Sequence, residues 1–153
     1  MALGCVNTWL TLSQIHTVHQ IMNRNVSALE TSNTVLDALK MMTEKGVGCV
    51  VITSSSRPVG ILTERDVMKA MMNGKEVLEY KLNDVMSQPL TTVRPDAAVT
   101  EALGVMKDRN IRRLPVVKED KLLGIITVHR DLLYWALAAC APNRTQPEGP
   151  TCG

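Results

Sequence analysis

The sequence repeats itself at a fixed spacing. The segment 22–63 aligns without a gap on the segment 86–127, an offset of 64 residues. A period of this length indicates two copies of one supersecondary unit. The identical pairs are Met22/Met86, Val35/Val99, Ala38/Ala102, Leu39/Leu103, Met42/Met106, Gly60/Gly124, Ile61/Ile125 and Thr63/Thr127.

Each copy predicts a helix in its first half. Apolar residues recur there at the three- and four-residue spacing of a helix that buries one face. Ser32 and Asp96 are the expected N-caps. Gly46 and Asn110 are the expected ends, because both residue types tolerate the left-handed backbone that closes a helix.

The rest of each copy predicts strands and a second helix. Two aliphatic runs separated by a polar turn are typical of a β-hairpin. With a short strand before the first helix, the unit is β-α-β-β-α. The expected first strands are 26–29 and 90–93, the hairpins 49–52 with 59–62 and 114–117 with 122–126, and the second helices about 64–72 and 130–139.

Size decides how the copies must be arranged. A unit of this length is too small to bury both faces of its sheet alone, so the two copies are expected to pack sheet to sheet around a pseudo-two-fold axis. The predicted class is mixed α+β. The chain divides into an extension (1–17), a first unit (18–74), a linker (75–81), a second unit (82–139) and a tail (140–153).

Composition limits the kinds of partner. The chain has no Phe, two Trp, two Tyr and nine Met, so aliphatic side chains must fill the core and a base-stacking platform is not expected. The net charge of +2 argues for neither nucleic acid nor membrane. The apolar run 132–141 is too short for a membrane span, and no Lys or Arg precedes Arg24 as a secretory signal requires.

We therefore expect a cytoplasmic protein with free thiols. Four cysteines form no CxxC pair. A bridge between Cys140 and Cys152 is left open as an alternative.

The pattern Thr63-x-x-Asp66 is compatible with two roles, helix capping and ligand binding. It is a capping box, in which both side chains stabilise a helix start without any ligand. It also lies where a strand runs into a helix N-terminus, whose free amides and positive dipole end attract a phosphate. The tetrapeptide alone favours capping, and the two roles can coexist.

The repeated framework resembles a tandem pair of cystathionine β-synthase (CBS) domains, often called a Bateman module. The resemblance rests on Gly60-Ile61-Leu62-Thr63-Glu64-Arg65-Asp66, on Ile111-Arg112-Arg113-Leu114-Pro115-Val116-Val117 and on Asp84-Val85-Met86, and it covers about 18–137. It implies a regulatory module, without catalysis, that binds an adenosine-containing ligand in clefts between the units. AMP, ADP or ATP is the implied class, with S-adenosylmethionine or NAD as further members.

The resemblance also implies which residues form the clefts. Asp66 would hold the ribose hydroxyls and Thr63 the ribose or phosphate. Apolar side chains and backbone would grip the adenine, and two arginines would reach phosphates as bidentate donors. A solvated turn is an equal alternative for the arginines, and a buried apolar role is favoured for Cys49. The implied set adds Ile61, Gly48, Cys49, Leu90, Ile111, Arg112 and Arg113.

The second copy departs from this pattern. The run Thr127-Val128-His129-Arg130-Asp131 has one residue more than its counterpart, and one residue rotates a helical side chain by about 100°. Either a bulge restores Asp131, or Arg130 takes the ribose position and the second cleft is altered.

Other chemistries have weaker support. His16, His19 and Cys5 lack a metal-ligand spacing, so no metal site is expected. No Gly-rich phosphate loop and no nucleophile with a matching base is present, so no cofactor or catalytic residue is expected. The alternatives to a ligand sensor are a structural or adaptor protein with vestigial clefts, and a nucleic-acid binder that uses Lys107, Arg109, Arg112 and Arg113.

The expected assembly is a homodimer. The resemblance implies a flat disc formed through helices, and the methionines at 41–42 and 68–72 are candidates for that surface, with burial in the core as an alternative. Ligand in a cleft is expected to change the angle between the units and so the surface offered to an unidentified protein partner.

Overall fold

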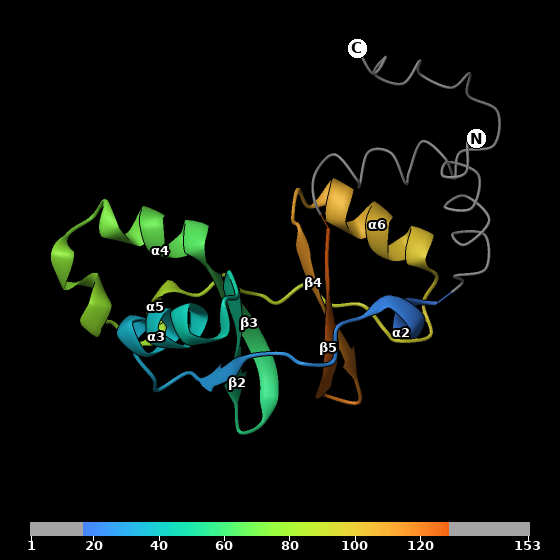
Figure 1. Cartoon of the computed structure of the whole chain (residues 1–153), viewed down its shortest axis with the longest axis horizontal. Coiled ribbons are helices and arrows are strands. Elements are labelled where there is room, and N and C mark those ends of the chain that lie inside the picture. Colours follow the sequence, from blue (N-terminus) through green and yellow to red (C-terminus); the bar gives the residue numbers. More distant parts are fainter. Residues whose placement is uncertain (1–16, 129–153) are drawn as a thin grey trace, which may run out of the picture.

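The computed structural model describes residues 17–128, and helices flank two small sheets at its centre (Figure 1). Strands β2 (Cys49–Ser54) and β3 (Arg57–Thr63) form one hairpin, and β4 (Arg113–Lys118) and β5 (Lys121–Thr127) form the other. Strand β1 (Ala28–Glu30) extends the first hairpin in parallel with β2. This arrangement confirms the predicted mixed fold of two related units.

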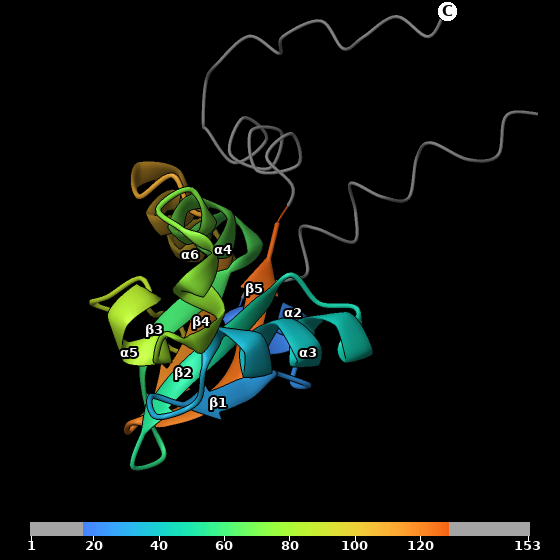
Figure 2. The ribbon, with the colours of Figure 1, turned by 90° about the vertical axis from the view of Figure 1, so that its left-hand side faces the viewer.

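The helices occupy the outer sides of the sheets (Figure 1). Those of the first half are α3 (Val35–Lys45) and α4 (Glu64–Met71), followed by the 3-10 turn η1 (Lys75–Glu79) and α5 (Leu82–Val85). Helices α2 (Val18–Ile21) and α6 (Val99–Asp108) cover the second hairpin. Helices α4 and α6 lie on the same side of the molecule (Figure 2).

The two hairpins turn in the same way. Each hairpin turns through two residues with positive φ, Ser55 and Ser56 in one and Glu119 and Asp120 in the other. Two successive residues with positive φ are typical of the type I′ turn, whose twist matches that of paired strands. The strands therefore reach closer to the turn than the sequence alone predicted.

The expected N-caps at Ser32 and Asp96 are wrong. Helix α3 begins after Thr34, whose hydroxyl accepts a hydrogen bond from Asp37 N at 3.3 Å while the Asp37 carboxylate accepts one from Thr34 N at 2.9 Å. This capping box satisfies two backbone donors at once and so fixes the start two residues later. In the second copy Ala98 holds the cap position, and Asp96 instead accepts hydrogen bonds from the Arg94 guanidinium.

Two other expectations need adjustment. The strand expected at 90–93 is reduced to a single bridge between Val93 and Val116. The expected linker at 75–81 contains η1, which buries Val77 (2% exposed) while Glu76, Glu79, Tyr80 and Lys81 stay exposed. The expected ends of the first helices are confirmed, because Gly46 (φ 62°) closes α3 and Asn110 (φ 52°) follows the end of α6.

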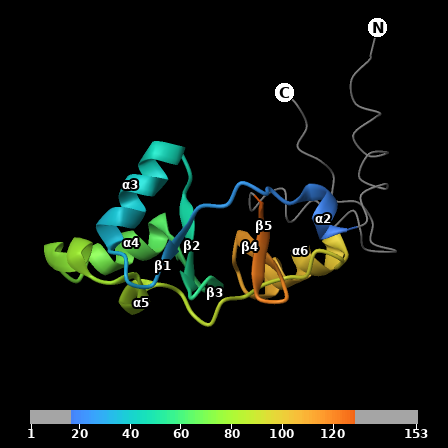
Figure 3. The same cartoon turned by 90° about the horizontal axis from the view of Figure 1, so that it is seen from below.

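The two repeats exchange their lead-in segments, which are the stretch before β1 in the first copy and the stretch before α6 in the second. The backbone of Asn23 in the first copy pairs with Ile125 in β5 of the second copy, and Ser87 pairs with Ile61 in β3 of the first. Figure 3 shows the chain crossing from α2 to β1 and back again between α5 and α6. One core accordingly contains Val18 and Met22 among second-copy residues, and the other contains Leu82 and Met86 among first-copy residues.

The exchange is held by close methionine–glycine contacts. A Cβ added to Gly124 would lie 2.8 Å from Met22 Sδ, and one added to Gly60 would overlap Met86 Sδ. Both members of each pair are identical between the repeats. Only a glycine allows the thioether to approach the strand so closely.

Candidate functional site

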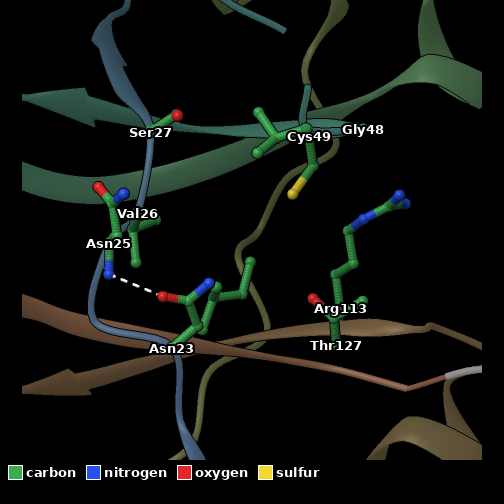
Figure 4. Close-up of a pocket in the computed structure, with 10 residues that line it drawn as sticks. Asn23, Asn25, Val26, Ser27, Gly48, Cys49, Arg113 and Thr127 are labelled. Carbon is green, nitrogen blue, oxygen red and sulfur yellow. Dashed lines mark hydrogen bonds between the residues drawn. The ribbon is translucent and has the colours of Figure 1, made fainter. Parts of the chain in front are cut away.

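A pocket of about 190 Å³ lies between the two hairpins (Figure 4). The lead-in before β1 and the start of β2 form one wall, and β4 and β5 form the other. The pocket therefore exists only because the two repeats pack together. Its lining residues are Asn23, Asn25, Val26, Ser27, Val47, Gly48, Cys49, Arg113, Ile125 and Thr127.

The polar side chains of the pocket have unused hydrogen-bonding capacity. The carbonyl oxygen of the Asn23 side chain accepts a hydrogen bond from Asn25 N at 2.9 Å, which fixes the lead-in. No hydrogen bond between described residues uses the side chains of Asn25, Ser27, Arg113 or Thr127. Because polar groups in a cleft normally find partners, this set is suited to hold a polar ligand.

Arg113 is the cation of the pocket. It is half-buried at the start of β4, and its side chain extends toward Gly48 and Cys49 of the other hairpin (Figure 4). A Cβ on Gly48 would lie 2.5 Å from a terminal guanidinium nitrogen of Arg113 and 3.1 Å from Glu64 Oε2. The missing side chain at position 48 is thus what leaves room for the guanidinium.

Cys49 contributes a half-buried free thiol to the same pocket. Burial raises the pKa of this thiol above its ordinary value, Arg113 opposes that shift, and Glu64 adds to it. The thiol is therefore neutral at physiological pH, as the predicted apolar role requires.

Thr63 and Asp66 form the predicted capping box at the start of α4. The Asp66 carboxylate accepts hydrogen bonds from Thr63 N at 2.9 Å and from the Thr63 hydroxyl at 2.7 Å. Its other oxygen accepts one from the Ser87 hydroxyl at 3.2 Å. The box therefore links α4 to the lead-in of the second copy, as well as starting a helix.

The structure divides the predicted site residues between two places. Gly48, Cys49, Arg113 and Thr127 line the pocket. The 64-residue offset maps the pocket onto a second place where the two repeats meet, here called the related seam. Its residues Ile61, Thr63, Leu90, Ile111 and Arg112 correspond in that order to the pocket residues Ile125, Thr127, Val26, Val47 and Gly48. Asp66 lies beside that seam through Ser87. The resemblance implies that Gly48 lies with Asp66, but Gly48 lines the pocket, on the other seam.

Sequence reasoning missed the contribution of the lead-in. Asn23, Asn25 and Ser27 line the pocket although no motif marks them. Applying the repeat offset to Ser87 and Leu90 could have pointed to Asn23 and Val26, since each pair shares one place in the repeat. Val47 and Ile125 complete the missed residues.

Several expectations concern residues outside the part that the structure describes. These are the ligand positions Arg130 and Asp131, the residues His16 and Cys5, and the alternative bridge between Cys140 and Cys152. Within residues 17–128, no group of three or more His, Cys, Asp or Glu residues is placed to hold a metal ion. No helix in the same range has the length and apolar character needed to cross a membrane.

The basic residues considered for nucleic-acid binding do not share one surface with Arg113. Lys107, Arg109 and Arg112 are exposed, whereas Arg113 lines the pocket. The four residues proposed as a nucleic-acid contact are thus divided between the solvent and the pocket.

Comparison with known proteins identifies the architecture. The sequence profile of the CBS domain matches residues 18–73 and 82–130. An uncharacterized protein of Methanopyrus kandleri is 41% identical over 119 residues, which cover 76% of this chain but 60% of that protein. The chain thus spans less than two thirds of that relative's length.

Solved structures agree with the sequence match. A hexameric CBS-CP12 protein from bloom-forming cyanobacteria has a TM-score of 0.70 and 30% identity, covering 86% of this chain and 78% of that one. Hypoxic Response Protein I, solved with two coordinated zinc ions, has a TM-score of 0.65 and 31% identity, covering 72% of this chain and 92% of that one. With both repeats matched and the fold shared, the chain belongs to the CBS domain family.

Proposed function

We propose that this chain is a regulatory module that binds an adenosine-containing ligand of the AMP, ADP or ATP class at the seam between its repeats. One observation carries the proposal: four polar side chains without partners among the described residues, Asn25, Ser27, Arg113 and Thr127, line one pocket between the two hairpins. CBS domain proteins are generally regulatory modules for such ligands, and the profile matches both repeats.

The chemistry of the pocket fits a nucleoside with an anionic group. Val26, Val47 and Ile125 offer apolar contact for a base, and the amides and hydroxyls suit ribose or base edges. The Arg113 guanidinium suits a phosphate. At about 190 Å³ the pocket is smaller than the roughly 300 Å³ at which sites for drug-sized ligands begin. A nucleotide would therefore place one part in the pocket and the remainder along the seam.

The position of the pocket suggests how binding is signalled. Its walls come from both repeats, and the lead-in that forms one wall also pairs with β5. A ligand that binds one relative position of the repeats better than another shifts the population toward that position. We infer that a partner protein responds to this change. Unchanged small-angle scattering and amide exchange on saturation with ligand would contradict it.

Calorimetry and thermal unfolding with adenosine, AMP, ADP and ATP test the binding function, with the guanine nucleotides as controls. At a ligand concentration of about 100 times Kd, binding stabilises the folded protein by roughly 2.7 kcal/mol. Thr127→Val should weaken binding, whereas Thr100→Val, an exposed threonine of α6, should not. No response to any of these ligands would refute the proposal and favour the adaptor function.

We also propose that the module is a homodimer. Met68, Met71 and the C-cap residue Met72 follow one another on one side of the end of α4 and are 68%, 50% and 87% exposed. Contiguous exposed apolar side chains mark interaction surfaces, and methionine adapts to a partner surface. The hexameric CBS-CP12 relative shows that proteins of this fold assemble into oligomers.

A further inference from the structure

The tips of the two hairpins meet at one edge of the molecule, on the side away from α4 and α6 (Figure 1, Figure 2). The first tip is the segment 54–57 and the second tip is the segment 118–121. An ion pair joins them, with Arg57 Nε 3.7 Å from Asp120 Oδ2. Both side chains are exposed, at 71% and 68%, so this single pair contributes little to stability.

The two tips differ in charge at matching positions. The offset of 64 aligns Ser54-Ser55-Ser56-Arg57 with Lys118-Glu119-Asp120-Lys121, so two serines of the first tip correspond to the two acidic residues of the second. The backbone is alike, because φ is 50° and 66° at these serines and 50° and 61° at the acidic residues. The turn of the first tip therefore has the backbone that carries acidic side chains in the second.

Contacts between the repeats come in pairs. The backbone bridges of the two lead-ins and their methionine–glycine contacts each occur twice, once in each direction. The same relation applied to the ion pair of Arg57 with Asp120 gives a second pair, of Lys121 with position 56. Position 56 is a serine, so this second pair has a cation and no anion.

Ser56 and Lys121 are both available for such a pair. Both are exposed, and the whole first tip is exposed, so an enzyme can reach the Ser56 hydroxyl. Within residues 17–128, Lys121 forms no ion pair and the Ser56 hydroxyl makes no hydrogen bond. A negative charge added at position 56 would thus meet an unpaired cation on the other repeat.

We propose that Ser56 is a phosphorylation site, and that phosphoserine at this position pairs with Lys121 to join the two tips. A separate serine kinase supplies a nucleoside triphosphate. The Ser56 hydroxyl oxygen bonds to the terminal phosphorus, the bond to the nucleoside diphosphate breaks, and the hydroxyl proton is released to solvent. The product has about −1.5 to −2 charges at pH 7 and three acceptor oxygens, which is more than a carboxylate offers.

Phosphorylation changes the tips from one isolated ion pair to a network. Two cations, Arg57 and Lys121, then face two anions, at positions 56 and 120. A network of several charges stabilises more than a single exposed pair does. Joined tips restrict the relative position of the repeats, which ligand binding is also proposed to change. The proposal rests on the tips alone and does not depend on the ligand.

A double-mutant cycle tests the pairing. Genetically encoded phosphoserine is placed at position 56 of the full chain, in the wild-type background and in Lys121→Gln, and thermal unfolding is followed at low salt. Phosphoserine should raise the thermal midpoint by about 1–4 °C in the wild-type background, and the gain should be lost in Lys121→Gln. A salt concentration of about 1 M should also remove the gain, because salt screens exposed charges.

Ser54 provides the matched control. It is an exposed serine of the same tip, but its counterpart is Lys118 and not an acidic residue. Phosphoserine at position 54 lies opposite Arg57 within its own hairpin, so its effect should be the same in the wild-type background as in Lys121→Gln. Equal coupling to Lys121 from positions 54 and 56 would show that the charge acts without a specific pair, and would overturn the inference.

Mass spectrometry of the protein from its native cells, growing and starved, tests the modification itself. We expect phosphate on Ser56 in a fraction of the protein. Absence of phosphate from Ser56 in both conditions, or a thermal midpoint unchanged by phosphoserine at position 56, would overturn the proposal. Neither outcome bears on the binding of adenosine ligands, which calorimetry tests separately.

Discussion

Met22, at the start of the first repeat, packs against Gly124 of the second repeat. A Cβ added to Gly124 would lie 2.8 Å from Met22 Sδ and 2.9 Å from the Asn23 carbonyl oxygen. Met86 and Gly60 repeat the contact in the opposite direction. Each repeat thus completes the core of the other, so the two copies should unfold as one unit.

Gly124→Ala should destabilise the protein by about 1–3 kcal/mol, because the new methyl group overpacks a site bounded by backbone as well as by a methionine. Gly104→Ala is the control. Gly104 lies inside α6 with nothing within 4 Å of an added Cβ, so alanine should stabilise the protein by roughly 0.5–1 kcal/mol. Urea unfolding measures both. Equal effects of the two substitutions would show that the contact does not restrict position 124.

The capping box of α3 should make stability depend on pH in the acid range. Hydrogen bonds from Thr34 and Asn33 hold the pKa of Asp37 below its ordinary value of 3.8. Stability from the charged carboxylate is therefore complete above the unfolded pKa and is lost as pH falls through the lower folded pKa. The stability difference between wild type and Asp37→Asn should be constant above about pH 5 and shrink toward pH 3. A difference that stays constant over this range would contradict the assignment.

The Cys49 thiol should report on the charges of the pocket. Burial raises its pKa, Arg113 opposes the shift, and Glu64 adds to it. Arg113→Met should move the midpoint of its alkylation rate to higher pH, and Glu64→Gln should move it to lower pH. Each shift should change the thiolate fraction at a fixed pH by less than about tenfold. Mass spectrometry of the Cys49 peptide separates this thiol from the others. Midpoints that moved in the same direction would refute the electrostatic account.

The exposed methionines at the end of α4 should mediate dimerisation. Met72→Glu places a charge on the most exposed of them and should convert a dimer to a monomer in light scattering after size exclusion. Ile21→Glu, at an exposed apolar position on α2, is the matched control and should leave the mass unchanged. A wild-type monomer, or a dimer that survives Met72→Glu, would remove α4 from the interface.

The repeat predicted most of the local structure. Its apolar spacing located α3 and α6, and its aliphatic runs located both hairpins, because burial imposes these periods on any sequence that forms such elements. The N-caps at Ser32 and Asp96 were wrong because alternative side-chain pairs, Thr34 with Asp37 and Arg94 with Asp96, formed instead. Such competition between neighbouring residues is decided by geometry that spacing does not contain.

The exchange of lead-ins could not be predicted, and it limited the prediction of the site. Both copies have the same methionine and the same glycine, so the sequence does not say which methionine meets which glycine. Asn23 and Asn25 reach the pocket only because the first lead-in lies against β5. Cys49 and Arg113, which belong to the hairpins themselves, were named because the resemblance to the CBS family implied them, and both line the pocket.

The reciprocal pairing also sets an order for folding during synthesis. Asn23 leaves the ribosome early, yet its backbone partner Ile125 lies near the end of the described chain. Until β5 emerges, Val18 and Met22 have no core to enter, whereas Leu82 and Met86 find the first hairpin already made. The half that is completed first is therefore the one containing α3 and α4, and α2 must wait as an unpaired apolar segment for the last strand.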